Sequence, residues 1–286
     1  MNKTIIAAVI VTYNRIVDLK LCIDAVKKQT MPCDIIVVNN GSTDGTKEYL
    51  DSIPNEVKAI HQNNMGGAGG FYAGSKYAYD NGYKWIWMMD DDGIPANNQL
   101  EQLLITATKN SLSVLNALVV NKDDHARLAF GRQELLSALD LNDEIVEQPL
   151  SPFNGTFIHR TVIDNVGFVK REMFIWGDEQ EYMARIRKAG ITPYTATSAI
   201  HYHPKEKGMK QYAIPFAQKG LVIEKPEKLS HYYYRNLGYI CWHYRNKIVT
   251  IKNIAYYTIF LTRKGKIKEL IKFYKYFIYG TINKFE

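Results

Sequence analysis

The chain has 286 residues, of which 46% are hydrophobic and 23% are charged, and its formal net charge is +7. This composition fits a soluble globular enzyme with one large core and a smaller C-terminal element. No stretch approaches the ~20 apolar residues that a membrane-spanning helix requires. The cysteines, Cys22, Cys33 and Cys241, are odd in number and lack metal-ligand spacing, so a reducing compartment is expected. No signal-peptide pattern follows Lys3, and we therefore expect a cytoplasmic protein.

Apolar runs alternate with helical patterns over the first third of the chain. Runs without polar alternation predict strands that are covered on both faces, and strands alternating with helices predict a parallel sheet. In such a sheet the loops gather at one edge, and ligands bind beyond the carboxyl ends of the strands. We therefore predict an α/β fold with a mostly parallel sheet flanked by helices. The predicted strands are residues 5–12, 35–38, 57–61 and 85–89.

A glycine-rich segment follows the third predicted strand and contains Gly66, Gly67, Gly69 and Gly70. No spacing within it gives the G-x-G-x-x-G fingerprint of dinucleotide-binding proteins, and the chain has no P-loop motif. We expect a loop in which a phosphate or a sugar can approach backbone N–H groups at the start of a helix that runs through Tyr79. The alternative is a flexible turn.

Three consecutive aspartates, Asp90, Asp91 and Asp92, end the fourth predicted strand. Adjacent carboxylates resist joint ionisation unless a hard cation neutralises them. Because alternate residues of an extended segment point the same way, Asp90 and Asp92 could share one metal ion while Asp91 turns aside. A solvated acidic turn is the alternative, since Asp-Gly followed by Pro95 is also good turn chemistry.

Three motifs, taken in order, resemble the inverting glycosyltransferases of family 2, which have a GT-A (Rossmann-like) fold. They are Val-Ile-Val-Thr-Tyr-Asn-Arg at 9–15, Asn-Asn-Gly-Ser-Thr-Asp-Gly-Thr at 39–46, and the aspartates. The resemblance covers about the first 205 residues. We therefore expect a GT-A domain at 1–205 and a C-terminal helical, basic amphipathic region at 206–286. The resemblance also implies a nucleotide-sugar donor and Mn²⁺ or Mg²⁺ as the cofactor.

The same resemblance implies roles for residues on the donor side. Thr12, Asn14 and Arg15 would border the nucleotide, and the 39–46 turn would meet the base and the ribose. Asn39-Asn40 stands where the family commonly has Asp-Asp or Asp-Asn, which leaves the contact with the nucleobase open. The other residues assigned to the donor are Asn40, Ser42, Asp44, Gly66, Gly67, Gly69, Gly70 and Asp91.

Metal ligands are also implied by the resemblance. Asp90 and Asp92 match the positions that hold the cation bridging the donor diphosphate. A third ligand is expected near the end of a later strand, where we favour His203 and keep His201 as the alternative.

A second acidic cluster, Asp178-Glu179-Gln180-Glu181, begins a helical pattern. Negative charge is favoured at a helix N-terminus, so helix capping is one interpretation. The family places its catalytic base in this region. Reading back from Arg185 gives the base position to Glu179, with Asp178 as the alternative. Nearby, Trp176, Tyr234 and Arg235 are assigned to acceptor binding because sugars stack on aromatic faces, with core packing as the alternative.

The excess positive charge lies in the tail, since residues 247–286 hold nine Lys or Arg and two Glu, a net charge of +7. We predict a basic amphipathic helix that contacts an anionic membrane surface. A helix docked on the body or in a homo-oligomer is the alternative, and no nucleic-acid module accompanies the charge. The predicted apolar face is Ile267, Leu270, Ile271, Tyr274, Phe277 and Ile278, with Lys266, Lys268, Lys272 and Lys275 on the remainder.

The combined pattern predicts a metal-dependent inverting hexosyltransferase that builds a bacterial surface glycan, such as O-antigen, capsule or cell-wall polysaccharide. Residues 64–71 together with both acidic clusters look most like the galactofuranosyltransferase branch, whose donor is UDP-galactofuranose. Transfer from dTDP-rhamnose or from a UDP-hexopyranose is the alternative. A catalytically silent scaffold of a glycan assembly complex is the alternative of another class. The acceptor would be a glycan or a lipid-linked glycan at the inner face of the cytoplasmic membrane, where the protein would be peripheral.

Overall fold

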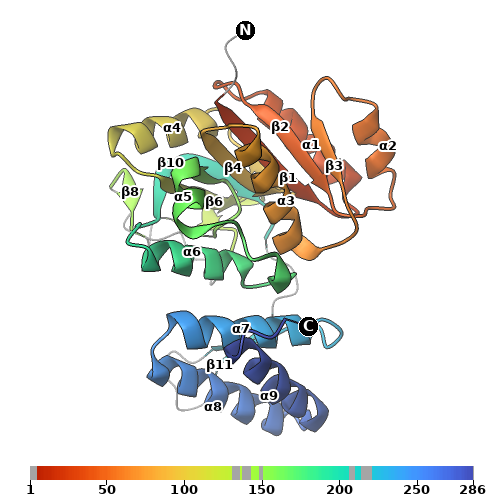
Figure 1. The fold of residues 1–286 in the computed structure, drawn as a ribbon, viewed down its shortest axis with the longest axis vertical. Helices are drawn as coiled ribbons and strands as arrows, with labels where there is room; N and C mark the ends of the chain where they lie inside the picture. Colours follow the sequence, from red (N-terminus) through yellow and green to blue (C-terminus); the bar gives the residue numbers. More distant parts are fainter. Residues whose placement is uncertain are drawn as a thin grey trace.

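The computed structural model describes residues 5–130, 136, 143–147, 151–205, 210–213 and 221–285. It has an α/β domain followed by a smaller C-terminal module (Figure 1). Residues 206–209, the first of the predicted C-terminal region, lie outside the described part of the chain. The elements of the α/β domain are β1 (Ile6–Thr12), α1 (Ile16–Lys27), β2 (Asp34–Asn39), α2 (Thr46–Asp51), β3 (Lys58–His61), α3 (Gly66–Asp80), β4 (Trp85–Asp90), β5 (Ile94–Pro95), α4 (Gln99–Lys109), β6 (Val114–Asn121), β7 (Asp124–Leu128), β8 (Ile145–Val146), β9 (Thr156–His159), α5 (Arg160–Val166), α6 (Asp178–Lys188) and β10 (Tyr194–His203).

The main sheet has the strand order β3-β2-β1-β4-β9-β6-β10-β5. The pairs β2–β3, β1–β2, β1–β4 and β6–β10 are parallel, whereas β9 is antiparallel to both of its neighbours. The short strands β5, β7 and β8 also pair antiparallel. The sheet is therefore mixed, with its four parallel pairs holding most of the paired residues, and the predicted α/β fold class is confirmed. Because β9 is antiparallel to both β4 and β6, strands β4 and β6 run in the same direction, and β10 is parallel to β6. Strand β10 therefore ends at the same edge of the sheet as β1, β2 and β4.

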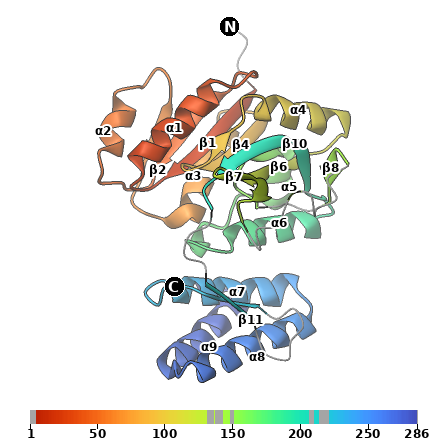
Figure 2. The same ribbon diagram turned by 180° about the vertical axis from the view of Figure 1, so that it is seen from behind.

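Helices cover both faces of the sheet, as the continuous apolar strands predict (Figure 2). Residues of α1 and α4 form one core with one face of β1, β2 and β4. Residues of α3, α5 and α6 form a second core on the opposite face. Trp87 of β4 is fully buried in the first core and Met88 in the second, as alternation along a strand requires.

The glycine-rich segment is the first part of α3 and not the loop that the sequence predicted. Glycine is a poor helix former, so its presence here needs a packing reason. A Cβ on Gly70 would lie 2.4 Å from Val11 Cγ1, and one on Gly74 would lie 2.3 Å from Val9 Cγ1. Side chains at these two positions would push α3 away from β1. Tertiary packing therefore outweighs helix propensity in this helix.

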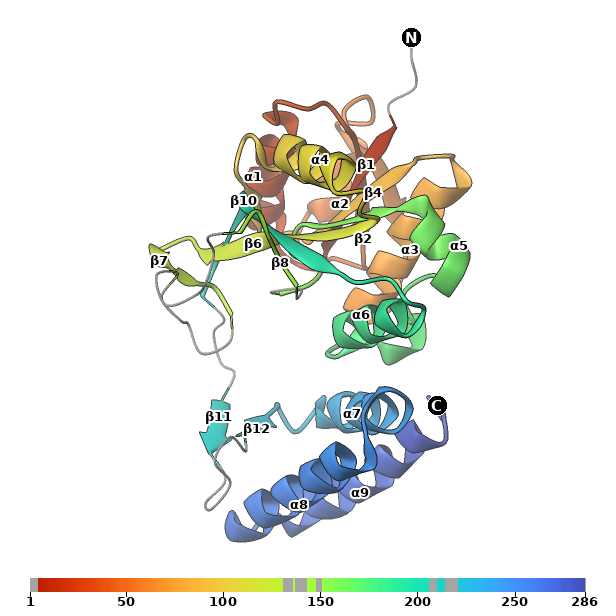
Figure 3. The same cartoon turned by 90° about the vertical axis from the view of Figure 1, so that its left-hand side faces the viewer.

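The C-terminal module contains a two-stranded antiparallel hairpin and three helices (Figure 3). Helices α7 and α9 pack closely because each has a glycine that faces the backbone of the other helix. A Cβ on Gly238 would lie 2.1 Å from the Phe277 carbonyl oxygen, and one on Gly280 would lie 1.9 Å from the Arg235 carbonyl oxygen. The module's elements are β11 (Lys210–Ala213), β12 (Leu221–Glu224), α7 (Ser230–Tyr244), α8 (Lys247–Arg263) and α9 (Ile267–Thr281).

Candidate active site

Two loops meet beyond the carboxyl ends of β1 and β2 and are tied together by side-chain hydrogen bonds. The Asn14 N–H donates to Ser42 Oγ over 2.9 Å, and Asn14 Oδ1 accepts from the Thr43 N–H over 2.7 Å. Asp44 Oδ2 accepts from the N–H of Ile16 in the first turn of α1 over 2.9 Å. Three residues predicted to bind the donor, Asn14, Ser42 and Asp44, therefore shape this edge of the sheet through contacts with each other and with α1.

Asn40 stands where the resemblance allows either Asp or Asn, and both ends of its amide form hydrogen bonds. Its Nδ2 donates to the Gly66 carbonyl oxygen over 2.8 Å, and its Oδ1 accepts from Gln62 Nε2 over 2.8 Å and from the Met65 N–H over 3.0 Å. Only an amide can both donate and accept in this way. Asn40 is 2% exposed, and its hydrogen bonds to Met65 and Gly66 hold the start of α3 in place.

Fewer backbone N–H groups are free to bind a ligand at the start of α3 than the sequence predicted. The Gly66 N–H donates to Asn64 Oδ1 over 2.9 Å, and the Ala68 N–H donates to the Phe174 carbonyl oxygen over 3.1 Å. Around Gly67, by contrast, a Cβ would meet nothing within 4 Å. Donor contacts predicted for these glycines therefore fit Gly67 best.

The aspartate cluster ends β4 and is contacted by two cationic side chains. Arg15 Nη1 forms an ion pair with Asp92 and lies 3.7 Å from Asp91 Oδ1. His203 Nε2, at the end of β10, lies 2.9 Å from Asp92 Oδ1. The fold thus brings together residues that follow β1 and β4 with the last residue of β10, although they are far apart in the sequence. Asp91 Oδ2 is buried and has no hydrogen-bond partner among the described residues.

The pKa values of the three carboxyl groups show that Arg15 and His203 stabilise the ionised form of Asp92 more than that of Asp90 or Asp91. Burial and the neighbouring Asp92 and Asp91 charges raise the pKa of Asp90 to about 7. Burial raises the pKa of Asp91 to about 7 as well. Burial also opposes ionisation of Asp92, but its contacts with His203 and Arg15 lower the pKa to about 2. Two carboxyl groups are therefore only partly ionised at neutral pH unless a cation joins them.

The two candidate histidines have different surroundings. His201 is fully buried, its Nδ1 lies 3.1 Å from Gln99 Oε1, and burial lowers its pKa to about 3. A Cβ on Gly93 would lie 2.1 Å from His201 Nε2, so this nitrogen is closed off by the backbone. His203 instead contacts Asp92, as a shared metal ligand would require.

No group of three or more His, Cys, Asp or Glu side chains is gathered tightly enough to form a complete metal site in the part of the chain that the structure describes. The donor set nevertheless fits a hard divalent cation, because Asp90 and Asp92 supply carboxylate oxygens and His203 supplies an imidazole. The raised pKa values and the unpartnered Asp91 oxygen indicate a site with more negative charge than the protein itself balances.

The second acidic cluster occupies the first turn of α6. Glu181 is 1% exposed and fully engaged, because Arg185 Nη2 lies 2.8 Å from its Oε2 and Tyr244 Oη donates to its Oε1 over 2.8 Å. Asp178 is also buried, and burial together with the Glu179 charge raises its pKa well above the usual range. Glu179 is partly exposed and accepts from the Gly177 N–H over 3.1 Å. The charge of Asp90 also raises the pKa of Asp178, so the two clusters lie within electrostatic reach.

The loop before α6 has an unusual backbone. Phe174 has φ +65° and Trp176 has φ +62°, values that non-glycine residues rarely adopt and that cost of order 1–3 kcal/mol each. Asn236 of α7 donates through Nδ2 to the carbonyl oxygens of Met173, Ile175 and Trp176 over 2.9, 3.1 and 2.9 Å. Sequence reasoning assigned no role to Asn236, and its position beside Tyr234-Arg235 was the available signal. This amide holds the loop that leads into Asp178.

Arg235 also holds the segment before α6 through hydrogen bonds to its carbonyl oxygens. It is 4% exposed, and its Nη2 donates to the carbonyl oxygens of Glu172 and Met173 over 2.8 and 3.1 Å. Tyr234 is also 4% exposed and packs edge-on against Phe273. As placed, neither side chain can meet an acceptor, which corrects the predicted contact for both. Trp176 is partly exposed, with Lys225 Nζ 4.5 Å from its ring centroid, and stays a candidate for acceptor binding.

A cavity of about 680 Å³ lies between α6 and α7, away from the aspartate cluster. Three cations, Arg187, Lys188 and Arg245, line it, and no carboxylate does. The other lining residues are Pro152, Gln180, Met183, Ala184, His243 and Tyr244.

Comparison with known proteins agrees with this architecture. The sequence profile described as Glycosyl transferase family 2 matches residues 7–167. Galactofuranosyltransferase GlfT1 of Mycolicibacterium smegmatis is 32% identical over 255 residues, which cover 84% of this chain and 83% of that protein.

Solved structures of low sequence identity share the fold. The crystal structure of S. aureus TarS 1–349 aligns with a TM-score of 0.65 at 15% identity, covering 98% of this chain and 82% of that chain. The mannosyltransferase PcManGT from Pyrobaculum calidifontis, solved with GDP-Man and Mn²⁺, aligns with a TM-score of 0.52 at 14% identity, covering 83% of this chain and 63% of that chain. The fold is therefore that of the GT-A glycosyltransferases.

Proposed function

The chain belongs to glycosyltransferase family 2, and on that premise we propose that it transfers galactofuranose from UDP-galactofuranose to a hydroxyl of a growing bacterial surface glycan, with inversion at the sugar carbon. Identity of 32% across most of the chain to a galactofuranosyltransferase supports this choice of sugar. dTDP-rhamnose and UDP-hexopyranoses are the competing donors, and a silent scaffold is the competing role.

The observation that carries the proposal is the contact of Asp92 with both Arg15 and His203 at the edge where β1, β4 and β10 end. Asp90, Asp92 and His203 would hold Mn²⁺ or Mg²⁺ there. When bound, the cation would neutralise the charge that builds on the leaving nucleotide. Mn²⁺ in the structure of the similar mannosyltransferase supports this cofactor. Arg15, Asn14 and Thr12 lie at the same edge and would border the nucleotide.

We assign the general base to Glu179. A base must be ionised before it can take a proton from the acceptor hydroxyl. Burial and the adjacent Glu179 charge raise the pKa of Asp178 well above its usual range, which favours its neutral form. Glu181 is already neutralised by Arg185. Glu179 is the partly exposed carboxyl group of this cluster, so we assign the proton transfer to it.

The acceptor is proposed to be a lipid-linked glycan, which would place the enzyme peripherally at the inner face of the cytoplasmic membrane. Arg187, Lys188 and Arg245 in the cavity between α6 and α7 would suit the phosphates of such a lipid. Trp176 precedes the proposed base by three residues and could stack on the acceptor sugar.

A transfer assay tests the proposal. Purified protein with Mn²⁺ is incubated with UDP-galactofuranose, dTDP-rhamnose or UDP-galactopyranose and a lipid-linked disaccharide acceptor, and product is measured by mass spectrometry. We expect product from UDP-galactofuranose alone, with loss on adding a chelator. Product from dTDP-rhamnose alone would replace the donor, and no turnover with any donor would favour the scaffold.

A further inference from the structure

The C-terminal module carries an apolar face that no part of the described chain covers. On α9, Ile267, Ile271, Tyr274 and Ile278 are spaced for one side of a helix and are 39–65% exposed. The predicted amphipathic face is thereby split, because Phe277 is buried and Leu270 is partly buried against the module. Phe273, which the predicted face did not include, is fully buried.

Helix α8 continues this surface. Ile248, Ile251 and Ile259 lie on one side of α8 and are 41–65% exposed. The two helices are joined along this side by a hydrogen bond of 2.7 Å between Thr258 Oγ1 and Tyr274 Oη. We call the exposed residues of α8 and α9, together with Ile282, the outer face. These positions hold eight of the fifteen large apolar side chains that are exposed among the described residues.

The outer face points away from the GT-A domain. Buried side chains of α8 and α9, including Tyr257 and Phe273, form the module's core with α7. Figure 3 shows α7 on the side of the module nearest the GT-A domain, with α8 and α9 beyond it. A flat partner could therefore cover the outer face without meeting the catalytic domain.

The exposed charges of the α8–α9 segment itself are of one sign. In residues 247–285 the single acidic residue is Glu269, which is 6% exposed. Its carboxylate accepts from Ser230 Oγ and lies 2.8 Å from Lys272 Nζ. No negative charge of this segment thus reaches the outer face.

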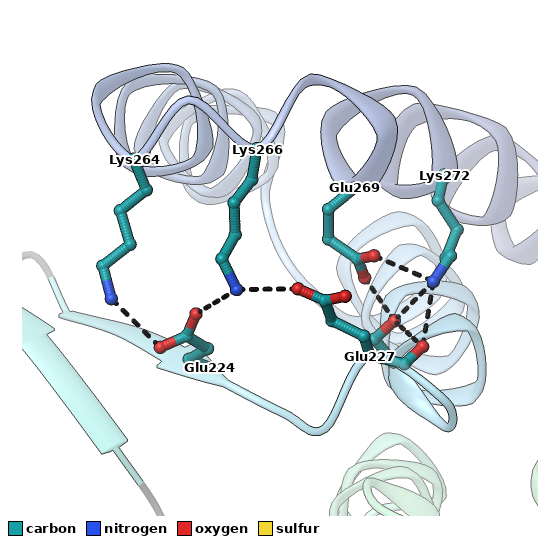
Figure 4. Close-up of polar contacts among 7 residues, drawn as sticks. Glu224, Glu227, Lys264, Lys266, Glu269 and Lys272 are labelled. Carbon is teal, nitrogen blue, oxygen red and sulfur yellow. Dashed lines mark hydrogen bonds and ion pairs between the residues drawn. The ribbon is translucent and has the colours of Figure 1, made fainter.

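Figure 4 shows which of the segment's cations are already paired. Lys266 Nζ lies 2.9 Å from Glu224 and 2.8 Å from Glu227, and Lys264 Nζ lies 3.2 Å from Glu224. These pairs fasten the α8–α9 turn to β12 and to the segment before α7. Six other cations are exposed and have no ion pair with a described carboxylate, namely Lys247, Lys252, Arg263, Lys268, Lys275 and Lys284.

We propose that the outer face of α8 and α9 docks in the plane of an anionic lipid bilayer. Isoleucine and tyrosine side chains would enter the boundary between headgroups and acyl chains, while the unpaired cations would meet lipid phosphates. A second copy of the chain fits less well, because an isologous contact would bring two sets of six like charges together. None of the helices in the described ranges has the length and apolar content to cross a bilayer, so the docked module lies on the membrane.

Vesicle sedimentation of the full chain tests this surface. Vesicles of phosphatidylcholine with phosphatidylglycerol are compared with phosphatidylcholine alone. We expect at least tenfold tighter binding to the anionic vesicles and at least tenfold weaker binding for the double variant I271S/I278S. The matched control is I105S, since Ile105 is 49% exposed on α4 of the GT-A domain, and it should bind like the wild type. A second variant, K268E/K275E, should lose the preference for anionic vesicles.

Equal vesicle binding by the wild type and I271S/I278S would overturn the proposal, as would no binding by the wild type. A dimer seen by light scattering that I271S/I278S abolishes would assign the outer face to a second copy instead. The inference rests on the proposed lipid-linked acceptor, but vesicle binding requires neither donor nor acceptor. Failure of the proposed sugar transfer would therefore leave the vesicle result standing, and the reverse also holds.

Discussion

The two acidic clusters of the active site balance their charges differently. At the end of β4, three carboxyl groups share Arg15 and His203, and the pKa values of Asp90 and Asp91 are raised to about 7. At the start of α6, Arg185 forms an ion pair with Glu181, and burial together with the Glu179 charge raises the pKa of Asp178 well above its usual range. We propose that the first cluster uses its negative charge to bind a cation, whereas the second provides Glu179 for proton transfer.

The largest effect is expected from Glu179→Gln. Removing a general base typically costs 10²–10⁴-fold in rate, so we expect kcat to fall by about that factor while UDP binding in Mn²⁺ stays unchanged. Asp178→Asn is the matched control, because an amide replaces a carboxyl whose raised pKa favours the neutral form. Its kcat should fall by less than about tenfold. Full activity in Glu179→Gln, with loss in Asp178→Asn, would exchange the two roles.

Asp92→Asn tests whether the aspartate cluster at the end of β4 binds a metal ion. We expect Mn²⁺ affinity, measured by calorimetry, to fall by at least roughly 10- to 100-fold, because that range applies to the hydrogen-bond partners of a ligand and Asp92 is proposed as a ligand itself. His203→Asn should weaken Mn²⁺ binding in the same direction. His201→Asn should leave Mn²⁺ affinity unchanged and lower thermal stability, since His201 is buried against Gln99. Equal Mn²⁺ affinity in wild type and His203→Asn would remove His203 from the ligand set.

Asn236→Ala tests how the second cluster is positioned. The variant leaves three loop carbonyls without this donor, which should lower the free energy of unfolding by about 1–3 kcal/mol. Misplacement of Glu179 should lower kcat by up to about 10²-fold, with little change in UDP affinity.

The control for this variant is Asn253→Ala on α8, whose amide donates only to the Val249 carbonyl within its own helix. It should match the wild type in kcat. If Asn236→Ala loses stability but keeps its kcat, the amide is structural and does not position the base.

The smallest effect is a pH dependence of stability that belongs to Asp178. Its folded-state pKa is raised well above the usual aspartate value of 3.8, so the folded protein binds the proton more tightly than the unfolded chain does. The contribution to stability is present below about that value and is lost as pH rises toward the raised pKa. Urea unfolding should therefore show Asp178→Asn gaining stability over the wild type as the pH is raised above 3.8. A constant difference across this range would mean that Asp178 ionises normally.

The sequence predicted the strands and the acidic positions because apolar runs and strand-ending aspartates are local signals. It misplaced the start of α3, since the need for glycine at Gly70 comes from Val11 on another strand. It also gave Arg235 to the acceptor, because the carbonyls that satisfy this guanidinium lie about sixty residues away and carry no side-chain signature. The sequence of α9 has apolar residues on two sides of the helix, so the sequence alone could not show which side is buried.

The central claim is that the aspartate cluster binds a UDP-sugar through a divalent cation. Titration of the protein with UDP, dTDP and GDP by calorimetry, each with and without Mn²⁺, tests it most directly. The account predicts binding of UDP that requires Mn²⁺ and is lost in Asp92→Asn. Binding of UDP that is unchanged by Mn²⁺, or no nucleotide binding at all, would contradict it.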